Sequence, residues 1–198
     1  MSCLCLGPKR AGKSHLLKAL QDANAIDGTS YSVPTVGTSI YNIRFPIQPA
    51  KPASGGEAAK ASTDTNTNSK NKATQKVKDP NKSIQVLEIG GAMAPLWRRY
   101  FNNVKKIIYV VDTSNLCQIS AAGVLLYSIL AEPRLQKTKF LLVLSKMDYA
   151  YRQMRNEALL MLQMSKLQKE IRQEMTIVET SSVTREGFDK IYEWLQAS

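Results

Sequence analysis

Apolar and polar positions along this chain form alternating blocks that predict strands and helices in turn. Continuous apolar runs predict buried strands at 3–6, 106–111 and 140–144, and another strand is predicted at 175–180. Two further strands are predicted at 40–47, from alternation, and at 83–89, directly before Gly90-Gly91. Helical spacing predicts helices at about 13–24, 120–130 and 186–196, one or two helices over 156–173, and a short helix-like segment at 92–101. Strands alternating with helices predict a doubly wound α/β domain with a mostly parallel six-stranded sheet.

Residues 48–82 break this alternation. They are mainly Ala, Lys, Ser, Thr, Asn, Pro and Gly, with Val77 the only β-branched apolar residue. Such a segment buries too little apolar surface to offset the cost of ordering its backbone. We therefore predict a single domain over 1–198, interrupted by a disordered insertion at about 48–82. Its seven lysines outnumber three acids, so it is either a neutral insertion, which we favour, or a basic tether for an acidic partner or membrane.

A phosphate-binding loop follows the first predicted strand. Residues 7–14, Gly-Pro-Lys-Arg-Ala-Gly-Lys-Ser, fit the pattern G-x-x-x-x-G-K-[ST] between a strand and a helix, which is the context this motif requires. Glycines let backbone N–H groups close on phosphate oxygens at the positive end of the helix. We expect Lys13 to reach the β- and γ-phosphates and the Ser14 hydroxyl to bind Mg²⁺. The nucleotide-binding residues predicted here are Gly7, Arg10, Ala11, Gly12, Lys13, Ser14 and His15.

Ser145-Lys146-Met147-Asp148, directly after the fifth strand, indicates which base is bound. A carboxylate at Asp148 can accept hydrogen bonds from the N1–H and N2 amino groups of guanine, whereas adenine would leave it unpaired. The aliphatic stem of Lys146 can cover one face of the base. Ligands bind at the carboxyl ends of strands in such sheets, and each motif follows a strand.

Composition narrows the function classes without selecting one. The 198 residues are 43% hydrophobic and carry a net charge of +11. This basic character fits a solvated surface better than a dedicated nucleic-acid site, because no aromatic residues interleave with the lysines of residues 48–82. Three cysteines and one histidine show no zinc spacing. We see no signal peptide, transmembrane run or lipidation motif, and expect a cytoplasmic monomer that meets membranes only through partners.

The motifs, in their order, resemble a small GTPase of the ADP-ribosylation-factor-like family. They are the phosphate loop, P-T-V-G at 34–37, the strand followed by Gly90-Gly91, P-L-W-R-R-Y-F at 95–101, V-V-D at 110–112, S-K-M-D at 145–148 and E-T-S-S at 179–182. The resemblance covers nearly the whole chain apart from the insertion and implies the architecture of a P-loop GTPase, the G domain.

The resemblance implies further roles. Thr35 would be the switch I threonine that binds Mg²⁺ and senses the γ-phosphate, and the N–H of Gly91 would contact that phosphate. Lys146 and Asp148 would bind guanine, with Ser181 and Ser182 contributing backbone N–H groups of the last loop. The implied ligands are GTP, GDP and Mg²⁺. The implied partners are effectors, an exchange factor and an activating protein, which bind the switch regions in membrane trafficking.

Four departures from the family pattern bear on mechanism. Ala92 occupies the position of the glutamine that orients the attacking water, so we expect very slow intrinsic GTP hydrolysis and name no catalytic residue. Glu88 replaces an aspartate that holds Mg²⁺ through water, so a carboxylate is retained on a side chain that is one methylene longer. Ser145 replaces an asparagine and makes fewer bonds. Arg10 replaces a small residue, and its guanidinium either approaches the γ-phosphate or, as we favour, points to solvent.

Two other function classes remain open at this stage. One is a small P-loop phosphotransferase, although Arg152 and Arg155 follow the guanine motif instead of forming a lid over the phosphates. The other is a scaffold that keeps the fold without binding nucleotide, which the substitutions at Ser145, Glu88 and Ala92 make credible.

Overall fold

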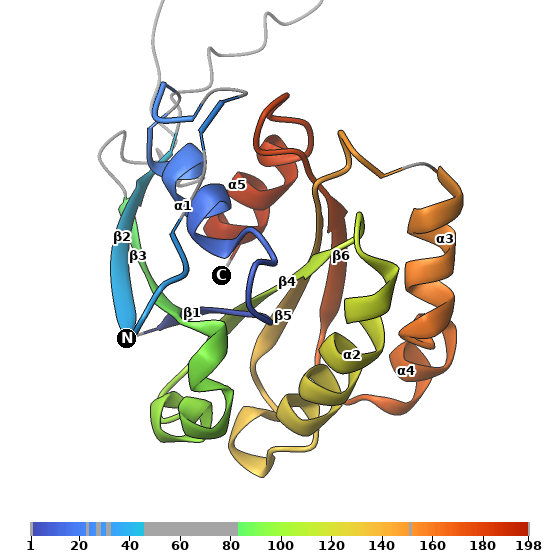
Figure 1. Ribbon diagram of the computed structural model, residues 1–198. Coiled ribbons are helices and arrows are strands. Elements are labelled where there is room, and N and C mark those ends of the chain that lie inside the picture. Colours follow the sequence, from blue (N-terminus) through green and yellow to red (C-terminus); the bar gives the residue numbers. More distant parts are fainter. Residues whose placement is uncertain are drawn as a thin grey trace, which may run out of the picture.

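The computed structural model describes residues 2–22, 24–26, 29–30, 33–45, 83–150 and 152–197 (Figure 1). The predicted insertion at 48–82 lies outside the described residues. In order, the elements are β1 (Cys3–Leu6), α1 (Lys13–Gln21), β2 (Thr38–Arg44), β3 (Ser83–Ile89), the 3₁₀ helix η1 (Gly91–Tyr100), β4 (Lys106–Asp112), α2 (Leu116–Leu130), the 3₁₀ helix η2 (Pro133–Leu135), β5 (Lys139–Ser145), α3 (Arg152–Met161), α4 (Met164–Glu170), β6 (Met175–Glu179) and α5 (Phe188–Gln196). Over these described ranges, no helix is long and apolar enough to span a bilayer.

The strands form one sheet in the order β2-β3-β1-β4-β5-β6. Only β2 and β3 pair antiparallel, with Thr38 opposite Ile89 and Arg44 opposite Ser83. The other neighbours are parallel, which confirms the predicted mostly parallel six-stranded sheet. The central strand β1 lies between β3 and β4, so the loop that follows β1 emerges between the loops that follow those two strands.

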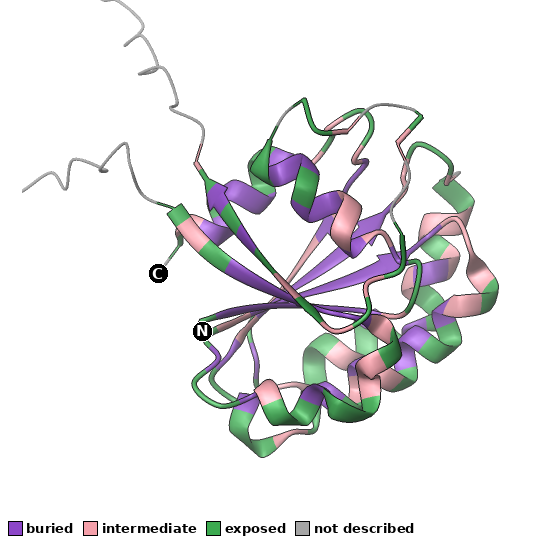
Figure 2. Ribbon diagram, turned by 60° about the vertical axis from the view of Figure 1, so that its left-hand side comes forward, coloured by how far each residue is buried: buried purple, intermediate pink, exposed green. Residues whose placement is uncertain are grey.

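Helices cover both faces of the sheet. In Figures 1 and 2, α1 and α5 lie on one face, while η1, α2, α3 and α4 lie on the other. Strands β4 and β5 are buried along almost their whole length, as expected for parallel strands covered on both sides. Cys3 and Cys5 are buried in β1, and burial raises the pKa of the Cys3 thiol to about 12. Both therefore act as small apolar side chains in the core.

Several element boundaries differ from the sequence-based expectation. Helix α1 ends at Gln21 instead of about residue 24, and α2 begins at Leu116, four residues before the predicted start. The predicted helical region 156–173 is two helices, separated at Gln163, whose φ is +47°. The segment after β3 is a 3₁₀ helix that contains Pro95, which has no backbone N–H to donate.

Candidate functional site

The loop between β1 and α1 has the backbone geometry of a phosphate cradle. Gly7 has φ +146° and packs so closely on the Val110 carbonyl that a Cβ would collide with it. Gly12 precedes α1 with φ +88°, and Arg10 adopts φ +62° with an exposed side chain. The loop thus combines left-handed residues with the free N–H groups of a helix N-terminus, the arrangement that binds anions.

Lys13 is buried inside this loop. Its side chain is 5% exposed, and Nζ donates hydrogen bonds to the carbonyl oxygens of Gly7 at 2.9 Å and Pro8 at 2.8 Å. Burial lowers the pKa of Lys13. An ammonium group has three donors, so one remains for an anion in the loop, and a phosphate there would also offset the desolvation of the charge.

Three oxygens meet beside the loop. Ser14 Oγ donates to Glu88 Oε1 at 2.6 Å, and Thr35 Oγ1 donates to the same oxygen at 3.1 Å. The two hydroxyl oxygens lie 2.8 Å apart. Neighbouring ligands of an octahedral ion with metal–oxygen bonds of about 2.05 Å lie about 2.9 Å apart, so the three oxygens have the spacing of one triangular face of such a site.

The Glu88 carboxylate is 1% exposed, and its other oxygen, Oε2, has no hydrogen-bond partner among the described residues. A buried carboxylate with one free oxygen is costly unless a cation compensates it. Its charge is also felt by Tyr41, whose pKa is raised to about 12 by burial first and by Glu88 second. Across the described ranges, no cluster of three His, Cys, Asp or Glu side chains forms a metal site. The donor set is therefore hydroxyl and carboxylate oxygen, which suits a hard cation.

The two glycines after β3 pack against both neighbouring loops. A Cβ on Gly90 would collide with the Thr35 carbonyl oxygen, and a Cβ on Gly91 would collide with the backbone N of Lys9. Gly90 also donates its N–H to the Gly37 carbonyl at 2.9 Å. The candidate switch segments thus touch each other and the phosphate loop through backbone atoms, and only glycine fits at either position.

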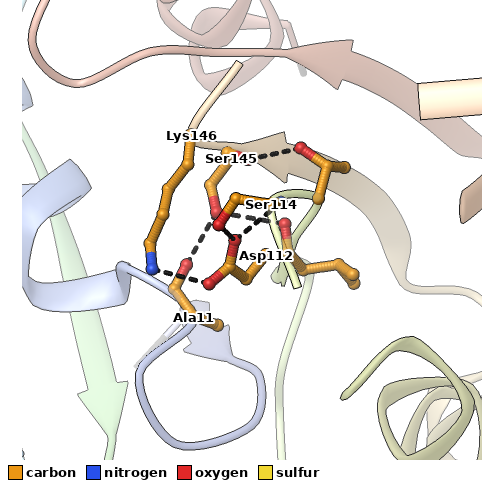
Figure 3. A network of polar contacts seen from close by, with 7 residues as sticks. Ala11, Asp112, Ser114, Ser145 and Lys146 are labelled. Atoms are coloured by element: carbon orange, nitrogen blue, oxygen red, sulfur yellow. Dashed lines mark hydrogen bonds and ion pairs between the residues drawn. The ribbon is translucent and has the colours of Figure 1, made fainter. Parts of the chain in front are cut away.

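The loop after β5 is joined to the phosphate loop by the network drawn in Figure 3. Ser145, which is 3% exposed, lies within hydrogen-bond distance of two carbonyl oxygens, Ala11 at 2.7 Å and Val111 at 3.0 Å. Lys146 forms an ion pair with Asp112 at 2.6 Å. Asp148 is exposed, so its carboxylate is accessible to a base.

The last loop, after β6, closes this side of the site. Ser181 is buried, and its Oγ accepts the N–H of Val183 at 3.3 Å and of Thr184 at 3.1 Å, while Ser182 is half-buried. Thr180 accepts the N–H of Met147 at 3.1 Å, which ties the last loop to the loop after β5.

His15 connects the first turn of α1 with the same region. Its side chain is half-buried, and burial lowers its pKa, as does the charge of Lys18, while the charge of Asp148 acts in the opposite direction. His15 and Asp148 are therefore electrostatic neighbours.

The structure thus gathers the predicted residues into two groups at one edge of the sheet. The first group surrounds the phosphate loop and consists of Ser14, Thr35, Glu88 and Gly91. The second group consists of Ser145, Lys146, Asp148, Ser181 and Ser182. Sequence reasoning missed Asp112 and Ser114 as members of the second group. A polar residue directly after a buried strand was the available signal, and Asp112 was noted only as part of a motif.

Comparisons with known proteins show the family to which this fold belongs. The sequence model of the ADP-ribosylation factor family matches residues 58–198. Human ADP-ribosylation factor-like protein 16 is 26% identical to this chain, with 99% of this chain and 85% of its own length aligned. ADP-ribosylation factor-like protein 1 of Caenorhabditis elegans is 25% identical over 98% of this chain and 87% of its own.

Among solved structures, the fold matches that of the Arl6 BBS3 small GTPase from Trypanosoma brucei with bound nucleotide analogue GppNp. The TM-score is 0.68 at 16% identity, covering 99% of this chain and 95% of the other. At this identity the likeness concerns the fold alone. The family match spans more than half of the chain, and the chain therefore belongs to the ADP-ribosylation factor family of small GTPases.

Proposed function

We propose that this protein is a guanine-nucleotide switch that binds GTP and GDP with Mg²⁺ and presents its switch regions to protein partners. The observation that carries the proposal is the joining of the phosphate loop to the loop after β5 through Ser145 and Lys146. Lys13 would hold the phosphates, and Asp148 would read the guanine edge. The N–H of Ser182 would complete the base site, and the N–H of Ser181, which donates to the Glu186 carbonyl at 3.3 Å, would have to be shared or released to take part.

Mg²⁺ would bind the hydroxyl oxygens of Ser14 and Thr35 and, directly or through the water that the family pattern implies, the carboxylate of Glu88. It would supply positive charge at the β- and γ-phosphates. The free Oε2 of Glu88 supports this assignment, because a nearby cation removes the cost of burying the carboxylate. Thr35 would link the ion to switch I. Partners that act in membrane trafficking, and a cytoplasmic location, follow from the family resemblance.

The test is binding of fluorescent GTP, GDP and ATP analogues with Mg²⁺ to the wild type and to Asp148→Ala. We expect selective guanine binding by the wild type. The variant should lose at least about a hundredfold in affinity, because two hydrogen bonds to a charged group are removed. Glu193→Ala, another exposed carboxylate outside the site, is the matched control and should bind normally. Equal binding of ATP would favour a phosphotransferase, and a folded wild type that binds no nucleotide would favour a scaffold.

Hydrolysis by this switch should be very slow without a partner. Ala92 is exposed at the start of η1, directly after the glycine that touches the phosphate loop, and a methyl group cannot orient water. Small GTPases with a positioned glutamine reach only about 10⁻⁴ per second unassisted. In single-turnover assays, Ala92→Gln should hydrolyse GTP faster than the wild type. An unassisted wild-type rate of about 1 per second would contradict this part of the proposal.

A further inference from the structure

Asp112, the last residue of β4, is a buried carboxylate with a full set of partners. It is 5% exposed. Its Oδ2 accepts the Lys146 ammonium at 2.6 Å, and its Oδ1 accepts the backbone N–H of Ser114 at 2.9 Å and the Ser114 hydroxyl at 2.6 Å (Figure 3). Ser114 thus holds one oxygen in place while the other faces Lys146.

Lys146 reaches Asp112 by crossing the phosphate loop. Its backbone has φ +61°, an uncommon conformation for a lysine. Its Cε lies 4.0 Å from the position that a Cβ on Gly12 would take. The aliphatic stem therefore runs past Gly12, and in Figure 3 it extends from the loop after β5 toward Asp112.

Lys146 is the lysine of the base-reading motif, and a free lysine side chain samples many rotamers. A side chain already fixed in its bound position loses less conformational entropy when a ligand arrives. We propose that Asp112, fixed by Ser114, is a positioning residue for guanine: it holds the Lys146 ammonium so that the lysine stem is presented to the base. This inference rests on the proposed function.

The ion pair does more than hold the strands together. β4 and β5 are already paired over seven residues, and the last of these pairs is Asp112 with Ser145. Thr113 adds a hydrogen bond from its hydroxyl to the Ser145 carbonyl at 2.7 Å. The Lys146 side chain is 36% exposed, so the pair lies at the open edge of the sheet, where the base would bind, and not in the core.

The test is a double-mutant cycle on GDP affinity with Asp112→Asn and Lys146→Met. Asparagine keeps the shape and the Ser114 bonds of Asp112 but removes the charge, and methionine keeps an apolar stem without the ammonium. Asp112→Asn alone should weaken GDP binding about tenfold, the effect of losing one charge-assisted bond. In the Lys146→Met background it should change affinity less than twofold, because Asp112 acts through Lys146.

Two controls separate positioning from folding. Thermal unfolding of the nucleotide-free proteins reports any loss of structure, and Glu174→Gln, which breaks the exposed pair with Lys139, should leave GDP binding unchanged. Ser114→Ala, a milder change, should weaken binding about threefold if Asp112→Asn does not fold.

Normal GDP binding by folded Asp112→Asn, or an equal loss in both backgrounds, would overturn the inference. A folded wild type that binds no guanine nucleotide would overturn the proposed function and this inference with it.

Discussion

A carboxylate buried within a strand is costly when one of its oxygens has no partner, and Glu88 is in this position. Its Oε1 accepts both the Ser14 and the Thr35 hydroxyl, while Oε2 has no partner among the described residues. We therefore expect the buried carboxylate to cost the nucleotide-free protein stability, and a bound cation would offset this cost. Sites of this kind commonly exchange stability for function.

Glu88→Gln should separate these two effects. The amide keeps the shape and can still accept the Ser14 hydroxyl, so the nucleotide-free protein should be at least as stable as the wild type. Affinity for Mg²⁺ in the presence of GDP should fall at least about tenfold, because a charged ligand is lost. The measurement is the melting temperature with GDP over a Mg²⁺ titration.

Glu132→Gln is the matched control for this experiment. The Glu132 side chain is 12% exposed and forms ion pairs with Arg98 and Arg134, away from the predicted metal residues. Its variant should keep the full Mg²⁺ response. If Glu88→Gln responds to Mg²⁺ as strongly as the wild type, Glu88 is not a ligand of the ion.

The contacts of Ser145 and Lys146 show which features of the site the sequence alone does not predict. The position of Ser145 after a buried strand placed it at the site, and the shorter side chain suggested fewer bonds than asparagine makes. Its one proton nevertheless has two carbonyl acceptors, Ala11 and Val111, because the phosphate loop and β4 approach it closely. The Asp112–Lys146 pair joins residues 34 positions apart, and a single sequence holds no signal for such a contact.

At the scale of elements, η1 is attached to β3 by Trp97. This side chain is 2% exposed, and its Nε1 donates to the Gly90 carbonyl at 3.3 Å. Gly90 and the adjacent Gly91 pack on the backbones of Thr35 and Lys9. Trp97 therefore fixes the start of η1 where both candidate switch segments meet the phosphate loop.

Trp97→Phe should lower the free energy of unfolding by about 1 kcal/mol more than Trp194→Phe, which removes a similar ring area. The difference arises because the Trp97 indole donates a hydrogen bond, whereas the buried Nε1 of Trp194 has no partner among the described residues. Urea unfolding of both variants measures it. Equal losses would show that the bond to Gly90 contributes nothing to stability.

Strands were easier to predict than helices for a physical reason. β4 and β5 end within a residue of their predicted bounds, because buried parallel strands are short apolar runs. The half-exposed β2 runs Thr38–Arg44 instead of 40–47. The break between α3 and α4 is set by tertiary contacts instead. Leu162 packs on Gly123, and its carbonyl accepts the Tyr127 hydroxyl at 2.8 Å. Neither contact is visible in the local sequence, which contains no Gly or Pro at the break.

At the scale of the molecule, strand order determines where the site lies. Because β1 is flanked by β3 and β4, the loops after those strands border the phosphate loop from both sides. In such sheets ligands bind at this crevice. The motif spacing predicts a site at this same edge, since the carboxyl ends of parallel strands share one edge.

The whole molecule contains one histidine, His15, whose imidazole ordinarily titrates near neutral pH. Burial lowers the pKa of His15 below the value of 6.5 that it has when unfolded. As pH falls through 6.5, the unfolded chain therefore takes up a proton before the folded protein does, and the folded state loses stability. Above that pH His15 is neutral in both states and contributes nothing.

His15→Gln should remove this dependence. From pH 7.5 to 5.5, the melting temperature of the wild type should fall relative to that of the variant, and the two should run parallel above pH 7. The buried cysteines do not interfere, because burial raises the pKa of both thiols well above this range. A constant difference between the two proteins across the range would mean that His15 has the same pKa folded and unfolded. If the melting temperature of the wild type instead rises relative to that of the variant as pH falls, the folded protein favours the protonated imidazole. The charge of Asp148 would then outweigh burial and the charge of Lys18.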